Sequence, residues 1–256
     1  MKYLNPRPDA REIGKYYESP DYVSHDAGQK NRLNFLYKLA RNISIKKKYK
    51  LVKYYARRKR LLDIGCGTGE FIFFCKQKGF RVTGIEPGEK PRAFAQTAYN
   101  LDVHEEDYFE NMTTQEFDVI TLWHVLEHVH QLNERINKIL EILNSDGSLI
   151  IAVPNCDSWD AGHYGKYWAA YDLPRHLYHF SQETMQILAD KHGLKIEKVI
   201  PMKLDAYYIS LLSEKYEKGK QNYFRAVMNG IRSNNSARRN NKNYSSLIYV
   251  MKKENN

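Results

Sequence analysis

The sequence has little cysteine and no long apolar run. Its three cysteines, Cys66, Cys75 and Cys156, are far apart and form no Cys-x-x-Cys pair, which argues against a disulfide framework and a thiolate zinc site. No stretch approaches the roughly 18 apolar residues of a membrane span, and the first ten residues lack the apolar segment of a signal peptide. We therefore expect a cytoplasmic protein that is soluble or at most peripheral to a membrane.

Acidic residues are missing from one long stretch. Residues 30–60 contain thirteen Lys and Arg and no acid, and residues 215–256 contain ten bases and two acids. Residues 61–214 contain thirteen bases and twenty-three acids, so the formal net charge of +10 belongs to two flanks around an acidic middle. A solvated surface accounts for such flanks. Peripheral membrane contact through residues 30–60 is the alternative, and we expect no nucleic-acid partner.

From residue 60 onward, short apolar runs alternate with helical patterns. Strands are expected at 60–65, 80–86, 101–107, 117–123, 148–155, 194–202 and 244–253. Helices are expected within 12–55 and at 70–79, 89–100, 124–147, 181–193, 206–216 and 222–231, with a polar loop at 232–243.

This alternation predicts the α/β class, with a seven-stranded, mostly parallel sheet and helices on both faces. We expect an N-terminal helical cap in residues 1–59 and a core in 60–204. Residues 205–256 would add a helical insertion and the last strand. Ligands of such sheets bind at the carboxyl ends of the strands.

A glycine-rich turn follows the first expected strand. Residues 63–70 read Asp-Ile-Gly-Cys-Gly-Thr-Gly-Glu, and glycine lets the backbone pass close to a ligand. A dinucleotide-binding turn would have its third glycine at position 70, where Glu70 stands. An acid at a helix start repels a pyrophosphate but accepts a cationic ligand.

Four segments in register resemble the class I S-adenosylmethionine-dependent methyltransferases, over roughly residues 61–201. They are the glycine turn, Glu86-Pro87, Asp107-Tyr108 and Trp123-His124. The resemblance implies a Rossmann-like sheet, the cofactor S-adenosylmethionine and the product S-adenosylhomocysteine. It also implies that the glycines line the methionine part of the cofactor and that Asp63 lies near its amino group. Glu86 would accept hydrogen bonds from the ribose hydroxyls, Asp107 would accept one from the adenine amino group, and Tyr108 would cover the adenine ring. The expected cofactor-binding residues are Asp63, Gly65, Cys66, Gly67, Gly69, Glu86, Pro87, Asp107, Tyr108, Trp123 and His124.

The octapeptide at 123–130, Trp-His-Val-Leu-Glu-His-Val-His, matches a zinc-hydrolase pattern through His124-x-x-Glu127-His128. Because the octapeptide follows the fourth expected strand, we instead predict that it forms the wall between the cofactor and the methyl acceptor. The segment also resembles that of ubiquinone-pathway O-methyltransferases, Glu-x-x-Glu-His, which carries a divalent metal. Here His124 replaces the first acid, and imidazole favours a softer ion than magnesium. We predict no metal, with a site at His124, Glu127 and His128 as the alternative.

The segment 167–181 resembles the proline-arginine-histidine segment of bacterial small-molecule methyltransferases. Arg175, His176 and His179 could reach an acceptor; alternatively Asp172 and Arg175 pair and His176 braces the loop. Because histidine has the pKa range of a general base, His176 is the first candidate catalytic residue and His124 the second.

The function expected is therefore O-methylation of a small-molecule acceptor. The alternatives are methylation of nucleic acid or protein through the basic flanks, and cofactor binding without catalysis. Nothing in the sequence specifies the acceptor or the oligomeric state.

Overall fold

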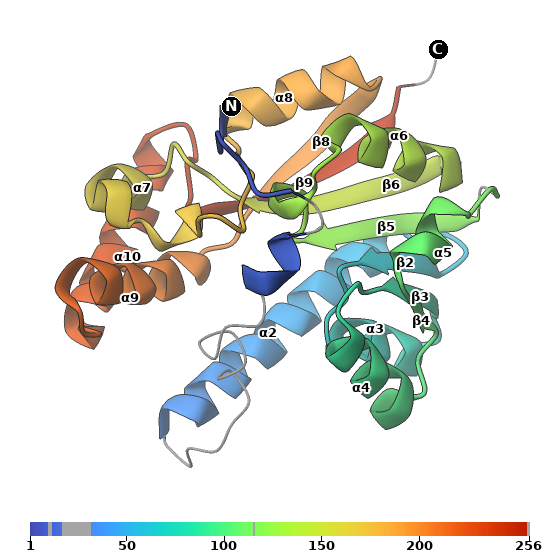
Figure 1. The fold of residues 1–256 in the computed structure, drawn as a ribbon, viewed down its shortest axis with the longest axis horizontal. Helices are drawn as coiled ribbons and strands as arrows, with labels where there is room; N and C mark the ends of the chain where they lie inside the picture. Colours follow the sequence, from blue (N-terminus) through green and yellow to red (C-terminus); the bar gives the residue numbers. More distant parts are fainter. Residues whose placement is uncertain (10–11, 17–31, 115, 255–256) are drawn as a thin grey trace.

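A seven-stranded sheet runs through the molecule (Figure 1). The computed structural model describes residues 1–9, 12–16, 32–114 and 116–254, without the side chains of 32–40. The strands of the sheet are β2 (Arg60–Ile64), β3 (Arg81–Ile85), β4 (Val103–His104), β5 (Phe117–Trp123), β6 (Leu143–Pro154), β8 (Leu194–Pro201) and β9 (Ser246–Lys253). Their spatial order is β4-β3-β2-β5-β6-β9-β8. Strand β9 runs antiparallel to the other six strands, which are all parallel to one another. This arrangement confirms the predicted fold class.

Helices cover both faces of the sheet. The helical elements are η1 (Ile13–Tyr16), α2 (Arg32–Tyr55), α3 (Glu70–Gln77), α4 (Glu89–Tyr99), α5 (Glu106–Glu110), η2 (Leu126–His128), α6 (Leu132–Ile142), α7 (Trp159–Tyr164), η3 (Gly165–Tyr167), η4 (Ala169–Tyr171), α8 (Gln182–Lys191), α9 (Asp205–Lys218) and α10 (Tyr223–Arg239). The central strands are buried on both sides, and so β5 is apolar along most of its length.

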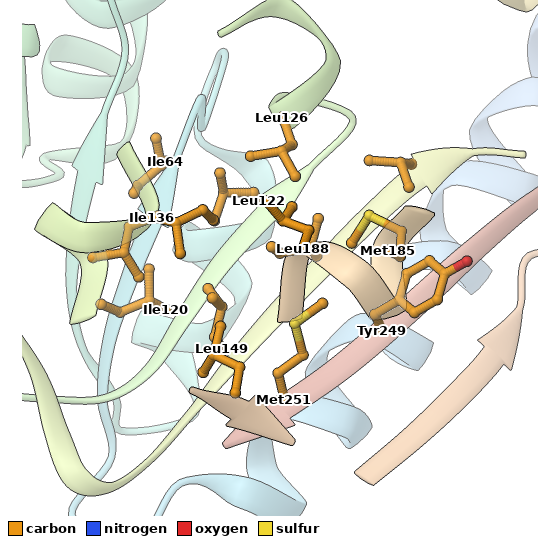
Figure 2. Packing of buried hydrophobic residues seen from close by; sticks show 14 of the residues in the cluster. Ile64, Ile120, Leu122, Leu126, Ile136, Leu149, Met185, Leu188, Tyr249 and Met251 are labelled. Atoms are coloured by element: carbon orange, nitrogen blue, oxygen red, sulfur yellow. The ribbon is translucent and has the colours of Figure 1, made fainter. Parts of the chain in front are cut away.

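Each face has its own apolar core. Figure 2 shows Ile136 of α6 and Leu188 of α8 packed against Ile120 and Leu149 of the sheet. On the opposite face, Val52 of α2 joins side chains of α3 and α4. The amino-terminal helix α2 thus packs against the sheet through its second half, and this fixes where its side chains meet the strand ends.

A third cluster lies outside the sheet, where α7, α9 and α10 pack together (Figure 1). Helices α9 and α10 are inserted between β8 and β9, as the sequence predicts for the C-terminal insertion. A Cβ atom at Gly230 of α10 would lie 2.5 Å from the ring of Tyr207 in α9. Glycine at this position therefore permits the close approach of the two helices.

The predicted helix at 124–147 is wrong at both ends. His124 has a φ of 58°, which interrupts a helix at its start, and only η2 and α6 are helical. The last residues belong to β6, because Leu143 pairs with Phe117 of β5 and Asn144 donates to Asp118. Strand pairing overrides the turn composition of 144–147.

Two smaller predictions also need correction, and one element was not predicted. The expected polar loop at 232–243 is helical up to Arg239, because Ser233 donates to the buried Asp160 and small residues face inward. The expected strand at 101–107 contains only β4, followed by α5. An unforeseen two-stranded sheet joins β1 (Lys2–Tyr3) to β7 (Tyr178–His179).

Of the helices expected within 12–55, η1 and α2 are observed, and 17–31 lie outside the described residues. The division of the chain at residues 60 and 205 stays a prediction. Among the helices in the described part of the chain, none has the length and apolar character that crossing a membrane requires.

Candidate active site

Left-handed backbone shapes the glycine turn after β2. Gly65, Gly67 and Gly69 have φ angles of 71°, 57° and 82°, which glycine adopts without steric cost. A Cβ atom at Gly65 would lie 2.4 Å from Cγ2 of Val125, whereas one at Gly67 would meet none of the described residues within 4 Å. The turn therefore packs tightly on the loop after β5 and leaves open space at Gly67.

Two carboxylates stand at neighbouring strand ends. Asp63 of β2 is 2% exposed and accepts a hydrogen bond from Thr121. Burial raises the pKa of Asp63 to about 7, although the bond from Thr121 lowers it. Glu86, which follows β3, accepts bonds of 2.8 Å from the N–H groups of Gly67 and Gly88, and burial raises its pKa as well. Both carboxylates are poorly solvated, so a ligand with ammonium or hydroxyl donors would stabilise them.

The predicted adenine contacts lie on α5. Asp107 is exposed in the first turn of this helix, and Tyr108 is half exposed. The ring of Tyr108 stacks on His104, with centroids 3.7 Å apart and planes 11° apart. A ligand could therefore stack only on the other face of Tyr108.

Trp123 ends β5 beneath a lysine from α2. Lys48 Nζ lies 4.5 Å from the centroid of the Trp123 ring, and Phe71 contacts that ring edge-on. Burial lowers the pKa of Lys48, while the charges of Asp63 and Asp205 raise it. The indole N–H of Trp123 is buried and has no hydrogen-bond partner among the described residues. Lys48 thus lies over Trp123 and interacts electrostatically with Asp63, and the indole of Trp123 keeps a spare donor among the described residues.

His124 sits between two carboxylates. Its Nδ1 lies 3.4 Å from Glu127 Oε1 and its Nε2 lies 3.3 Å from Asp205 Oδ2. Burial lowers the pKa of His124, but its interactions with the carboxylates of Asp205 and Glu127 outweigh burial and raise the pKa to about 9. The side chain is therefore a cation at neutral pH, and this does not favour its predicted role as a base.

Glu127, His128 and His176 form a compact cluster beside this ion pair. One ligand atom of each lies within 4.8 Å of the others. His128 Nδ1 lies 3.1 Å from the carbonyl oxygen of Arg175, and His176 Nδ1 lies 2.8 Å from that of Ala170. Because a carbonyl only accepts, each Nδ1 carries the proton, and in the neutral ring Nε2 is the basic nitrogen. Burial lowers the pKa of His128 to about 4.

The alternative metal set predicted from sequence differs from this cluster in one member. The structure groups His176 with Glu127 and His128, and engages His124 with Asp205 instead. The donors of the cluster, two imidazoles and one carboxylate, suit a divalent transition metal. Both oxygens of Glu127 are buried and accept no well-formed hydrogen bond in the described part of the chain, although Oε1 is ion-paired with His124. These three side chains could therefore hold such an ion.

The loop from 172 to 179 has the bracing contacts expected as an alternative. Asp172 pairs with Arg175, and His176 fastens the loop through Ala170. His179 is buried, and burial followed by the charge of His176 lowers its pKa to about 4. The bracing fixes the ring of His176 in place.

Comparison with known proteins now identifies the class. The model of a family described as "Methyltransferase domain" matches residues 36–199, which is more than half of the chain. The chain belongs to this methyltransferase family. Membership confirms the resemblance to class I S-adenosylmethionine-dependent methyltransferases, a family whose cofactor is S-adenosylmethionine.

Two curated relatives illustrate the similarity. A putative methyltransferase from Geobacillus sp. (strain WCH70) is 36% identical over 116 residues, which cover 41% of this chain and 47% of the relative. A ubiquinone biosynthesis O-methyltransferase from Pseudomonas fluorescens (strain Pf0-1) is 33% identical over 105 residues, covering 38% and 45%. The chain thus spans about half the length of the curated relatives that it matches.

A solved structure supports the fold over a longer range. Magnesium protoporphyrin IX methyltransferase from Synechocystis PCC 6803, with bound S-adenosylhomocysteine, superposes with a TM-score of 0.61 and 14% identity. The match covers 96% of this chain and all of that one. At this identity the likeness shows the methyltransferase fold alone.

The residues present fit the methyltransferase cofactor. Among the described residues, none fills the space above Gly67 and none accepts from the Trp123 indole, while Asp63 and Glu86 offer acceptors to the ammonium and hydroxyl groups of the cofactor. Cys66 is half-buried next to Gly84, and Pro87 follows Glu86. The individual contacts of these residues with a cofactor stay predictions.

Sequence reasoning missed three residues of this methyltransferase site. Lys48 lies within a run of bases and looks like any exposed lysine of α2 in sequence. Thr121 lies within an apolar strand, and Asp205 begins a helix that is far away in the chain. Asp205 could have been suspected as the acid at the start of α9; Lys48 had no distinguishing signal.

Proposed function

We propose that this protein transfers a methyl group from S-adenosylmethionine to a hydroxyl oxygen of a small-molecule acceptor. The observation that carries the proposal is the arrangement of His176. Its Nδ1–H is fixed by the Ala170 carbonyl, so that Nε2 is its basic atom. Its ring contacts that of His128, in the segment that begins at Val125 against Gly65. His176, the proposed proton acceptor, is thus joined through His128 and the segment from Val125 to the glycine turn.

The cofactor supplies a methyl group on a sulfonium centre, so the protein's main task is to align donor and acceptor. Asp63, once deprotonated, and a protonated Lys48 would carry opposite charges and suit the ammonium and carboxylate of the methionine part. Glu86 suits the ribose hydroxyls, and Asp107 with Tyr108 the adenine.

A hydroxyl acceptor must lose its proton during the transfer, and His176 is the residue we propose for this role. Asp172 Oδ2 lies 3.7 Å from His176 Nε2 and would stabilise the imidazolium that forms. His124 is already a cation, and the pKa of His128, about 4, makes it a weak base. Similarity to relatives named as ubiquinone biosynthesis O-methyltransferases supports an oxygen acceptor.

The cluster geometry favours a second role for the same side chains. Glu127, His128 and His176 would together hold a divalent metal, which would bind the acceptor oxygen and lower its pKa. His176 would then be a ligand and no longer the base. Metal titration by calorimetry separates the two roles. If the cluster holds a metal, wild type shows heat of binding and Glu127→Gln loses it; if His176 acts only as a base, neither protein shows heat of binding at this site.

The experiment is a screen of hydroxylated acceptors, read out by release of S-adenosylhomocysteine. With a responding acceptor and no added metal, His176→Ala should lower kcat about 100-fold or more and leave S-adenosylhomocysteine affinity unchanged. His192→Ala is the matched control, since His192 bonds to Asn133 and Asn137 on the α6 side of the molecule. Unchanged turnover of His176→Ala would refute the role of this base.

A further inference from the structure

Helix α10 (Tyr223–Arg239) buries its small and polar residues and exposes its large apolar ones. Its inward face consists of small or polar residues, namely Ala226, Asn229, Gly230, Ser233, Asn234 and Ala237. Asn229 donates to the hydroxyl of Tyr164, and Ser233 donates to Asp160. The helix is therefore tied to the molecule by hydrogen bonds and close backbone packing, and its large apolar side chains take no part in this.

The large apolar side chains of α10 face outward. Phe224 is 77% exposed, the most of them, and the whole set, called here the α10 stripe, is Tyr223, Phe224, Val227, Met228 and Ile231. The spacing of these residues places them on one face over more than two turns. A surface helix normally buries such a face, and a contiguous exposed one marks an interaction site.

Arginines border the α10 stripe. Arg225, Arg232 and Arg239 recur every seven residues, so they follow one edge of the helix with little drift. Arg225 lies 3.7 Å from Glu214, and Arg232 donates to Asn229, so both side chains are anchored beside the stripe. No acid occurs within α10. The surface is thus apolar in the middle and positive along its edge.

We propose that the α10 stripe docks on an anionic lipid surface, with its apolar side chains in the acyl boundary and its arginines at the phosphates. This composition is typical of amphipathic helices that lie in the membrane interface. A second copy of the chain fits less well, because a two-fold contact through the stripe would bring positive edges of both copies together.

The position of the helix gives the docking a consequence. Helix α10 packs on α9, and α9 begins with Asp205, which contacts His124 in the candidate active site. In a docked protein, the helix on the membrane would therefore contact α9, the helix that carries Asp205 into the candidate active site. Docking itself needs no catalysis, so its test is independent of the proposed function.

The test is flotation of the full chain with vesicles of phosphatidylcholine, with and without an equal amount of phosphatidylglycerol, at low and raised salt. We expect binding to the anionic vesicles only, weakened by salt. Phe224→Ser with Met228→Ser should weaken it about tenfold or more, and Arg232→Gln with Arg239→Gln about tenfold. Ile187→Ser on α8 is the matched apolar control, because Ile187 is 59% exposed, and should bind like wild type.

Three results would overturn the proposal. One is absence of binding to anionic vesicles at low salt. Another is binding that survives the stripe variant but is lost in Lys46→Gln with Lys50→Gln, which would place the contact on α2. The third is a concentration-dependent mass in light scattering that the stripe variant abolishes, which would make the stripe a contact between copies. Circular dichroism of each variant establishes that it is folded.

Discussion

At the scale of single residues, Lys48 completes the charge pattern of the cofactor site. The methionine part of the cofactor is a zwitterion, and Asp63 alone matches only its ammonium group. Lys48 places an amino group over Trp123, where it interacts electrostatically with Asp63. Lys48→Ala should therefore weaken S-adenosylhomocysteine binding about tenfold, a loss of about 1.4 kcal/mol, measured by calorimetry. Lys47→Ala, one position away on the exposed side of α2, should bind as wild type; equal affinities of the two variants would contradict the assignment.

The pKa of Asp63 predicts how cofactor binding depends on pH. Burial raises this pKa from an ordinary value of 3.8 to about 7, so the free carboxyl is largely protonated below pH 7. A bound ammonium group favours the carboxylate and makes the site release a proton. Affinity for S-adenosylhomocysteine should therefore rise as the pH increases from 6 to 8.

The same raised pKa affects stability with the opposite sign. The stabilisation of the protonated form is complete below pH 3.8 and is lost as the pH rises through 7. Asp63→Asn should remove both slopes, that of affinity in calorimetry and that of unfolding free energy in urea. A variant that keeps the wild-type pH dependence of binding would show that another group titrates.

At the scale of elements, the glycine turn and the loop after β5 form one unit. Gly65 has a φ of 71°, and a Cβ atom there would overlap Val125, the residue after His124. Gly65→Ala should therefore lower stability by about 1–3 kcal/mol and reduce S-adenosylhomocysteine affinity. Gly162→Ala is the matched control, since a Cβ atom there meets nothing within 4 Å; thermal unfolding of the two variants should differ clearly.

The elements that sequence predicts best are those with a strong local pattern. Buried parallel strands appear as apolar runs, and β2, β3 and β5 were expected nearly in full. The helix predicted from sequence ends at residue 231, short of the observed end of α10, because Ser233, Asn234 and their neighbours have loop composition. The hydrogen bond from Ser233 to Asp160 makes their helical conformation favourable. Tertiary hydrogen bonds of this kind leave no periodic signal.

The candidate site divides in the same way. Asp63, the glycines and Glu86 lie at or just after the carboxyl ends of expected strands, so the parallel sheet brings them to one edge. The pairing of His124 with Asp205 joins segments eighty-one positions apart, and the grouping of His176 with His128 depends on a loop with no regular pattern. The sequence therefore predicts which residues gather at the glycine-turn end of the sheet, whereas for the proposed acceptor half it predicts only the residue types.

At the scale of the whole molecule, one buried carboxylate joins the sheet to the cluster of α7, α9 and α10. Asp160 is fully buried and accepts hydrogen bonds from Trp168, Ser233 and Ser245, of 2.8, 2.7 and 2.7 Å. These donors come from the segment after α7, from α10 and from the residue before β9. The carboxylate thus links the insertion to the strand that closes the sheet.

Removal of this carboxylate should destabilise the molecule and uncouple the insertion from the sheet. Asp160→Ala leaves three buried donors without an acceptor, and we expect the free energy of unfolding to fall by about 3 kcal/mol, measured in urea with Trp fluorescence and circular dichroism in parallel. Asp157→Ala, an exposed acid of the same segment, should change it by less than about 0.5 kcal/mol. Because Asp160 holds α10 against the sheet, the two probes should remain coincident in wild type and separate in Asp160→Ala. Coincident transitions with an unchanged free energy would mean that the insertion is held by its apolar contacts alone.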